Sequence, residues 1–324
     1  MQFLKGGITV LKKPKIIAVV GPTASGKSAL AEELATRLGG EIVSCDSMQI
    51  YRGMDIGTAK PTKDEMQGIE HHMLDVADPR VSFSSEDYSL LAEQCIDDII
   101  SRGKTPLFCG GTGLYLDCVL RGVRDDGANE DPEFRVEMEK LAAEYGNGHV
   151  HAMLAEIDPE SAQSIHENNL KRVIRALEVH RMTGKTKTEL DRLSKTVGSK
   201  YDAKVIYLCF NSRELLYDRI NRRVDIMLEN GLEDEIRRLA DCGELSHDTT
   251  AGQAIGYKEM LAYLNGNATL CEAVEQIKQN SRRYAKRQMT WFGARENYYR
   301  LFVDGEGGMR VLSELANEAE NFLK

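Results

Sequence analysis

The chain has 324 residues (36.2 kDa), of which 42% are hydrophobic and 29% charged; these ordinary globular values exclude long disordered, collagen-like or coiled-coil sequence. Its length predicts two domains or one elaborated domain. The longest apolar stretch near the N-terminus, residues 16–20, is far shorter than the roughly 20 residues of a membrane-spanning helix. We therefore expect a soluble protein that is neither secreted nor embedded in a membrane.

The cysteines and the net charge indicate the cellular compartment and the kind of binding partner. Seven cysteines are scattered along the chain without a C-x-x-C pair, which favours a reducing cytoplasm and gives no sign of a structural zinc site. A net charge of −9 argues against a nucleic-acid partner. However, residues 276–295 contain six Lys or Arg and no Asp or Glu, so we expect one strongly positive surface.

The N-terminal part alternates short apolar strands with glycine turns and helices, after a lead-in over residues 1–13. Residues 15–20 form a β-branched apolar run, and residues 29–38 form a helix that ends at a Gly-Gly pair. Two further short strands are expected over residues 41–44 and 105–109. This alternation predicts a parallel α/β sheet.

The middle of the chain reads as an all-helical insertion over residues 121–200. After a polar, turn-rich stretch at 121–132, helical patterns continue without a strand until about residue 203. The clearest helix, residues 169–183, carries an apolar i, i+3, i+4, i+7 stripe. Its opposite face is basic.

The final part returns to the sheet and continues as helices. Residues 204–210 form a strand, and four helices are expected at 214–230, 233–241, 258–264 and 270–292. We therefore predict a discontinuous P-loop NTPase-like core, a parallel sheet flanked by helices, from residues 14–120 and 201–300. Residues 301–324 are interpreted as a terminal extension, like 1–13.

A phosphate-binding loop follows the first strand. The segment fits G-x-x-x-x-G-K-[ST] between a predicted strand and a predicted helix, which is the context that a P-loop requires. Backbone N–H groups of such a loop surround anionic oxygens, the Lys adds a positive charge, and the Ser hydroxyl can bind Mg²⁺. The motif indicates a diphosphate or polyphosphate ligand without saying which molecule carries it. Its residues are Gly21, Pro22, Thr23, Ala24, Ser25, Gly26, Lys27 and Ser28.

Longer motifs point to a family. Asp46 follows the second strand, where ATPases, GTPases and kinases hold Mg²⁺, but the residues after it are unusual for those classes. Together the motifs GPTASGKS, DSMQIYRGMDIGTAKP, GGTGLYL, KRVIRALEVHRMTGK and QAIGYKE resemble the tRNA dimethylallyltransferases, or tRNA isopentenyltransferases. The resemblance extends from about residue 14 to residue 295.

The resemblance implies transfer of a dimethylallyl group from dimethylallyl diphosphate to N6 of the adenosine 3′ to the anticodon, in tRNAs that read codons beginning with U. The P-loop would then bind the leaving diphosphate with Mg²⁺, where negative charge develops. The family pattern makes Asp46 the general base, places Thr112 near the bridging oxygen, and makes Arg223 a second diphosphate ligand. The alternatives are a metal ligand or helix cap for Asp46, a turn-capping Thr112, and a solvated charged face for Arg223 beside Arg219 and Arg222.

The same resemblance implies contacts with the tRNA anticodon stem-loop around a flipped base. In the long C-terminal helix, basic residues lie beside Tyr284, Trp291 and Phe292, although we expect the last two rings to be core. Solvated faces are the alternative for the basic residues, and His71-His72 is expected to be structural. The expected tRNA contacts are Asp46, Ser47, Met48, Gln49, Lys171, Arg172, Val173, Ile174, Arg175, Arg282, Arg283, Lys286 and Arg287.

Three other functions fit parts of the sequence: a small-molecule P-loop kinase, prenyl transfer to free adenine nucleotides, and a nucleotide-switched RNA-binding protein. The basic helices favour a tRNA substrate over a small acceptor. We expect a cytoplasmic, Mg²⁺-dependent, monomeric enzyme with tRNA and dimethylallyl diphosphate as its partners and no obligate protein partner.

Overall fold

The computed structural model describes residues 13–121, 131–196 and 199–324. Most of the expected lead-in (1–13) and of the turn-rich stretch (121–132) lies outside these residues. The chain divides into two compact units, one formed by the segment up to Leu116 with Lys200–Lys324 and one formed by Asp117–Ser199. Within the described ranges, no helix combines the length and hydropathy needed to cross a bilayer.

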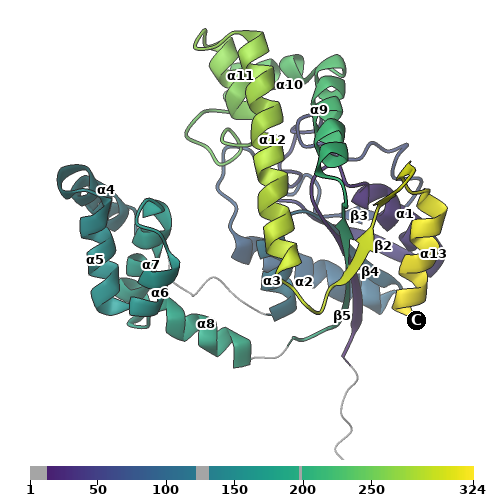
Figure 1. The fold of residues 1–324 in the computed structure, drawn as a ribbon, viewed down its shortest axis with the longest axis horizontal. Coiled ribbons are helices and arrows are strands. Elements are labelled where there is room, and N and C mark those ends of the chain that lie inside the picture. The colour runs from purple at the N-terminus through teal and green to yellow at the C-terminus, as the bar shows by residue number, and fades with distance from the viewer. Residues whose placement is uncertain (1–12, 122–130, 197–198) are drawn as a thin grey trace, which may run out of the picture. The chain divides into compact units, whose positions relative to one another are not determined.

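A six-stranded, fully parallel sheet forms the centre of the first unit (Figure 1). After its first residue, β1 is buried throughout, as expected where helices cover both faces of a parallel sheet. The predicted α/β fold is therefore confirmed. In the order β3-β2-β4-β1-β5-β6, the strands are His71–His72, Gly40–Cys45, Thr105–Gly110, Lys15–Val20, Asp202–Cys209 and Tyr299–Phe302.

Helices cover the two faces of this sheet. On one face α1 (Lys27–Leu38) packs beside α13 (Leu312–Leu323), and both share a core with Ile206 and Leu208 of β5 (Figure 1). Tyr207 points to the other face, where its ring lies 5.8 Å from that of Phe292 in α12.

The predicted terminal extension over residues 301–324 is wrong. Leu301 lies in β6, which pairs with β5, and Leu315 and Ala319 of α13 are buried against α1. Burial of these apolar side chains makes the C-terminus part of the α/β unit. The short strand and the i, i+4 apolar spacing of α13 were the sequence signals.

The four helices between β5 and β6 lie together in Figure 1. All four contribute side chains to a second apolar core, which they share with residues 50–54. They occur where the sequence predicts them, at α9 (Arg213–Glu229), α10 (Leu232–Asp241), α11 (Tyr257–Leu264) and α12 (Leu270–Gly293). Sequence reasoning missed α2 (Ser85–Ser101) and α3 (Gly113–Arg121).

The second unit is helical throughout its described part, as predicted. Its core is formed by side chains of α4 to α7, including the apolar stripe of α7. The helices are α4 (Pro132–Tyr145), α5 (Asn147–Ile157), α6 (Pro159–Ser164), α7 (Leu170–Thr183) and α8 (Lys187–Thr196).

Candidate active site

The P-loop joins β1 to α1 and opens onto a cavity of about 640 Å³. Ala24 takes a left-handed conformation (φ 61°), and its carbonyl oxygen accepts a hydrogen bond from Arg219 Nε at 2.8 Å. Lys27, Arg219, Arg222 and Arg223 all line this cavity. Cationic side chains beside a helix N-terminus are the arrangement that favours an anionic ligand.

Burial, more than repulsion between the cations, sets the pKa values of Lys27 and Arg223. Burial lowers the pKa of Lys27, and the neighbouring Arg223 charge lowers it further. Burial also lowers the pKa of Arg223, against the opposing effect of Asp46. Burial and the nearby Glu65 raise the pKa of Glu32, on the wall of the same cavity, to about 7. A bound diphosphate would relieve the repulsion between the two cations.

Asp46 follows β2 and Thr112 follows β4; these two strands pair with each other, and β4 also pairs with β1. The Asp46 carboxylate accepts a hydrogen bond from the N–H of Met48 at 2.9 Å. Thr112 Oγ1 accepts one from the N–H of Ser47 at 3.0 Å. The carboxyl ends of three adjacent strands therefore bring the P-loop, Asp46 and Thr112 together, at the edge where open α/β sheets bind ligands.

A second cavity, of about 260 Å³, adjoins this edge. Asp46, Ser47, Met48, Tyr284 and Arg287 line it, as do Thr23 of the P-loop and Arg223, which borders both cavities. Thr112 itself lines neither cavity. Its hydroxyl, however, bonds to Ser47 and Tyr284, and both of these residues line the second cavity. The rest of the wall is largely apolar and includes Ile220, Val224, Met227, Ala254, Ile255 and Ile277.

Two contacts fix the relative direction of α9 and α12, which both line this second cavity. Arg282 of α12 bonds to Asn221 of α9 at 2.5 Å, and Lys278 pairs with Asp225 at 2.7 Å, so the two helices run antiparallel. Moving along them away from Asn221, the cavity wall reaches Met227. Because a helix rises about 1.5 Å per residue, the apolar end lies roughly 10 Å from the polar end.

Gln288 is a buried residue that sequence reasoning missed. Its Oε1 accepts a hydrogen bond from the N–H of Thr23 in the P-loop at 2.8 Å, and its Nε2 donates to the carbonyl oxygen of Gly111 at 3.1 Å. A Cβ at Gly111 would lie 2.1 Å from that Nε2, so the glycine permits the close approach. Gln288 therefore ties the segment after β4 to the P-loop.

Gln49 is the best-anchored of the four residues at 46–49. Its Oε1 accepts a hydrogen bond from the Ser44 hydroxyl at 2.8 Å, and its Nε2 donates to the carbonyl oxygens of Thr58 and Ala59 at 3.3 and 3.1 Å. Arg223 Nη2 donates to the same Thr58 oxygen at 3.4 Å. The backbone at Thr58 is thus a common anchor for two predicted site residues.

The predicted tRNA contacts on α7 separate into two groups. Lys171 and Arg172 are exposed, whereas Arg175 pairs with the buried Glu178 at 2.6 Å. The expectation for Val173 and Ile174 is corrected, because their side chains are buried in the core of the helical unit. Both belong to the apolar stripe that the sequence already showed.

On α12 the predicted basic residues also differ in their surroundings. Arg283, Lys286 and Arg287 are exposed, and Arg282 is held by Asn221. Phe292 is core as expected, but Trp291 is 36% exposed, and the prediction for it is wrong. Its ring lies against Gly113, where a Cβ would come within 2.2 Å of Trp291 Nε1.

The paired histidines make protein contacts in β3. His72 Nε2 lies 2.7 Å from the buried Glu41 carboxylate, and His71 Nδ1 lies 2.9 Å from the carbonyl oxygen of Ile69. Across the described residues, no group of three or more His, Cys, Asp or Glu side chains converges as a metal site.

Comparisons with known proteins agree on one family. The IPP transferase family matches residues 49–296. The tRNA dimethylallyltransferase of Caldanaerobacter subterraneus subsp. tengcongensis is 48% identical over 291 residues, which make up 90% of this chain and 92% of that protein. The tRNA dimethylallyltransferase of Bacillus subtilis is 50% identical over 280 residues, covering 86% of this chain and 88% of that protein.

Solved structures that are similar to this chain belong to the same kind of enzyme. The full-length tRNA isopentenylpyrophosphate transferase of Bacillus halodurans matches with a TM-score of 0.69 and 46% identity over 96% of this chain and 97% of that one. A eukaryotic dimethylallyltransferase acting on tRNA matches with a TM-score of 0.76 and 30% identity over 89% of this chain and 74% of that one. The chain therefore belongs to the IPP transferase family.

Proposed function

We propose that this enzyme transfers a dimethylallyl group from dimethylallyl diphosphate to N6 of the adenosine 3′ to the anticodon, in tRNAs that read codons beginning with U. One observation carries the proposal: Arg223 borders both the P-loop cavity and the cavity at Asp46. A diphosphate held at the P-loop would therefore extend its organic part toward a carboxylate and an apolar wall. The names of the close relatives support this substrate pair.

The P-loop cavity binds the leaving group. Breaking the allylic C–O bond places negative charge on the diphosphate, and Lys27, Arg219 and Arg223 surround the space where that charge appears. These groups are arranged before the substrate arrives, because Arg219 is bonded to the P-loop backbone and Arg223 to the Thr58 carbonyl oxygen.

Mg²⁺ fits this site. The Ser28 hydroxyl and the Glu32 carboxylate line the same cavity, and Mg²⁺ prefers few protein ligands together with phosphate oxygens and water. We assign Ser28 as its protein ligand. When bound, the ion would neutralise charge on the departing diphosphate.

The second cavity receives the two reacting groups. We place the dimethylallyl chain toward Met227 and Ile277 at its apolar end, and the adenine toward Tyr284 and Arg287 at its polar end. The C1–O bond breaks, a bond forms from C1 to N6, and Asp46 accepts the N6 proton. The Thr112 hydroxyl orients the segment that follows Asp46 through Ser47.

The tRNA binds to basic helix faces. We assign phosphate contacts to Lys171 and Arg172 on α7 and to Arg283, Lys286 and Arg287 on α12, all of which are exposed. We further propose that the enzyme acts as a monomer in the cytoplasm, in line with an odd number of scattered cysteines that contain no C-x-x-C pair.

A transfer assay with competing acceptors tests the function. Labelled dimethylallyl diphosphate is offered with unmodified tRNA, AMP or ATP, each with and without Mg²⁺. The proposal predicts label in tRNA alone, and only with Mg²⁺. Label in a free nucleotide would instead show a nucleotide prenyltransferase, while ATP hydrolysis without transfer would indicate a kinase or a nucleotide switch.

A further inference from the structure

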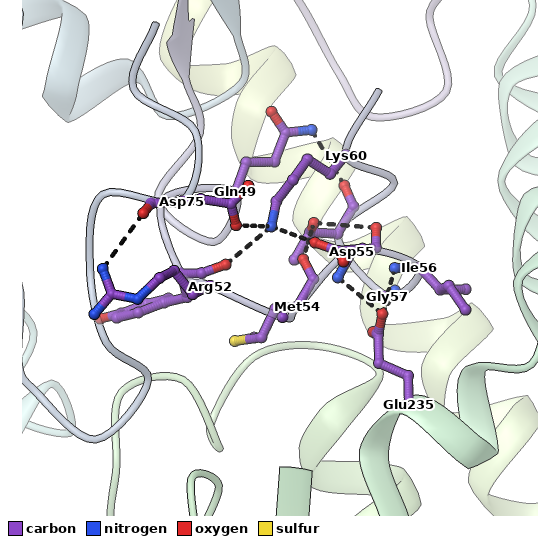
Figure 2. A network of polar contacts seen from close by, with 12 residues as sticks. Gln49, Arg52, Met54, Asp55, Ile56, Gly57, Lys60, Asp75 and Glu235 are labelled. Atoms are coloured by element: carbon purple, nitrogen blue, oxygen red, sulfur yellow. Dashed lines mark hydrogen bonds and ion pairs between the residues drawn. The ribbon is translucent and has the colours of Figure 1, made fainter. Parts of the chain in front are cut away.

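Glu235 is a buried carboxylate that the proposed reaction does not use. It lies in α10 with 8% of its surface exposed. Its Oε2 accepts hydrogen bonds from the N–H groups of Asp55 and Ile56 at 2.8 and 2.7 Å (Figure 2). Its Oε1 accepts from the Gly57 N–H at 3.1 Å and from the Tyr257 hydroxyl at 2.6 Å.

These four hydrogen bonds take the place of a cationic partner. No Lys, Arg or His in the described part of the chain forms an ion pair with Glu235. A buried charge is costly unless it is fully hydrogen-bonded, so holding three consecutive N–H groups is what stabilises this carboxylate.

The segment that Glu235 holds is also fixed from its other side. Lys60 Nζ bonds to the Asp55 and Asp75 carboxylates at 2.5 and 2.6 Å and to the Tyr51 carbonyl oxygen at 3.0 Å (Figure 2). The Lys60 N–H closes the turn by donating to the Asp55 carbonyl oxygen at 2.9 Å. Residues 55–60 are therefore clamped between a carboxylate and an ammonium group.

The clamped segment presents its backbone to the candidate active site. Gly57 and Thr58 line the cavity at Asp46. A Cβ at Gly57 would lie 2.5 Å from the Tyr257 ring, so the backbone at Gly57 is in close contact with that ring. The Thr58 carbonyl oxygen then accepts hydrogen bonds from Gln49 and Arg223.

We propose that Glu235 is a positioning residue: it fixes residues 55–58 so that the Thr58 carbonyl oxygen aims the Arg223 guanidinium at the diphosphate. The proposal rests on the diphosphate site described above. Arg223 has this backbone oxygen as a hydrogen-bond acceptor, and its long side chain needs such an anchor to be held in one conformation.

Only a carboxylate suits this position. Three N–H groups and one hydroxyl require four acceptor sites, which two carboxylate oxygens supply. A glutamine would offer one oxygen and turn an NH₂ group toward N–H donors. Glu235→Gln keeps the size of the side chain and removes part of the clamp, so it is the sharpest test.

The experiment measures the Kd of inorganic diphosphate with Mg²⁺, the KM for dimethylallyl diphosphate and the melting temperature. Glu235→Gln should raise both Kd and KM roughly tenfold, as expected when a hydrogen bond to a charged group is misaligned. The matched control is Glu233→Gln on the same helix, which among the described residues pairs with Arg237 and should leave both constants unchanged.

A double-mutant cycle separates positioning from general stability. In an Arg223→Gln background, Glu235→Gln should change Kd less than about twofold, because the residue through which it acts is gone. If Glu235→Gln prevents folding, Tyr257→Phe, which removes one of the four hydrogen bonds, replaces it in the double-mutant cycle.

The outcomes are distinct. An unchanged Kd with a lowered melting temperature, or the same loss of affinity with and without Arg223, would overturn the positioning proposal. Failure of the wild-type enzyme to transfer dimethylallyl to tRNA would contradict the proposed function itself, whatever the variants do.

Discussion

Gln288 offers a direct test of how the site is built. Replacing it with Leu keeps a similar volume but removes the hydrogen bonds to the Thr23 N–H and the Gly111 carbonyl oxygen. Each buried backbone group left without a partner costs about 1–3 kcal/mol, so a loss of at least roughly 2 kcal/mol of stability is expected. In a unit of this size, that lowers the melting temperature by roughly 4–8 °C.

Diphosphate binding should weaken at the same time. The Thr23 N–H belongs to the P-loop, and a loop no longer held by Gln288 has to be ordered by the ligand. We expect Gln288→Leu to raise the Kd of inorganic diphosphate by roughly tenfold, about 1.4 kcal/mol, in a calorimetric titration. The control is Gln279→Leu, a change on the exposed face of the same helix, where the Gln279 side chain bonds to the neighbouring Gln276. A stable Gln288→Leu variant with unchanged Kd would refute the argument that this side chain shapes the P-loop.

Three further predictions concern pH, RNA and chain length. Burial raises the pKa of Glu32 to about 7, so the folded state holds an extra proton between about pH 4.5 and 7 and loses stability as pH rises through that range. Glu32→Gln should therefore melt like wild type near pH 5 and higher than wild type at pH 8; equal melting at both would contradict the burial argument. Lys171→Ala with Arg172→Ala should weaken tRNA binding and reduce the slope of log K against log salt by about 1.4–1.8, measured by filter binding from low to high salt; an unchanged slope would mean that these cations face only solvent. Met227→Ala should let geranyl diphosphate act as a donor in the transfer assay, by enlarging the apolar end of the cavity; loss of dimethylallyl transfer without any gain would place the prenyl chain elsewhere.

The sequence predicted the parts of the fold whose signals are local. A local apolar period or turn chemistry marks the P-loop and the two strands that precede Asp46 and Thr112. It also marks the four helices between β5 and β6. The C-terminal strand and α13 were missed because the strand has only four residues and the helix gains its stability from packing on α1.

The site residues that the sequence did not predict depend on contacts with distant parts of the chain. Gln288, Glu235 and Tyr257 act through contacts 22 to 265 residues away in sequence, and no local pattern marks a buried amide or carboxylate that holds a distant backbone. Trp291 was misassigned because a tryptophan is usually largely buried, whereas 36% of this one is exposed in the folded chain. Such contacts become visible only once the chain is folded.

The proposed role of Asp46 as the general base can be measured in a single turnover. Single-turnover transfer of dimethylallyl to tRNA is measured with wild type and Asp46→Asn, with both substrates saturating and with tRNA affinity determined in parallel. We expect Asp46→Asn to lower the rate by roughly 10²–10⁴-fold with tRNA affinity nearly unchanged, because the variant loses the acceptor of the N6 proton. Transfer at the wild-type rate would contradict the proposed role, since the carboxylate at the end of β2 would then take no part in the reaction.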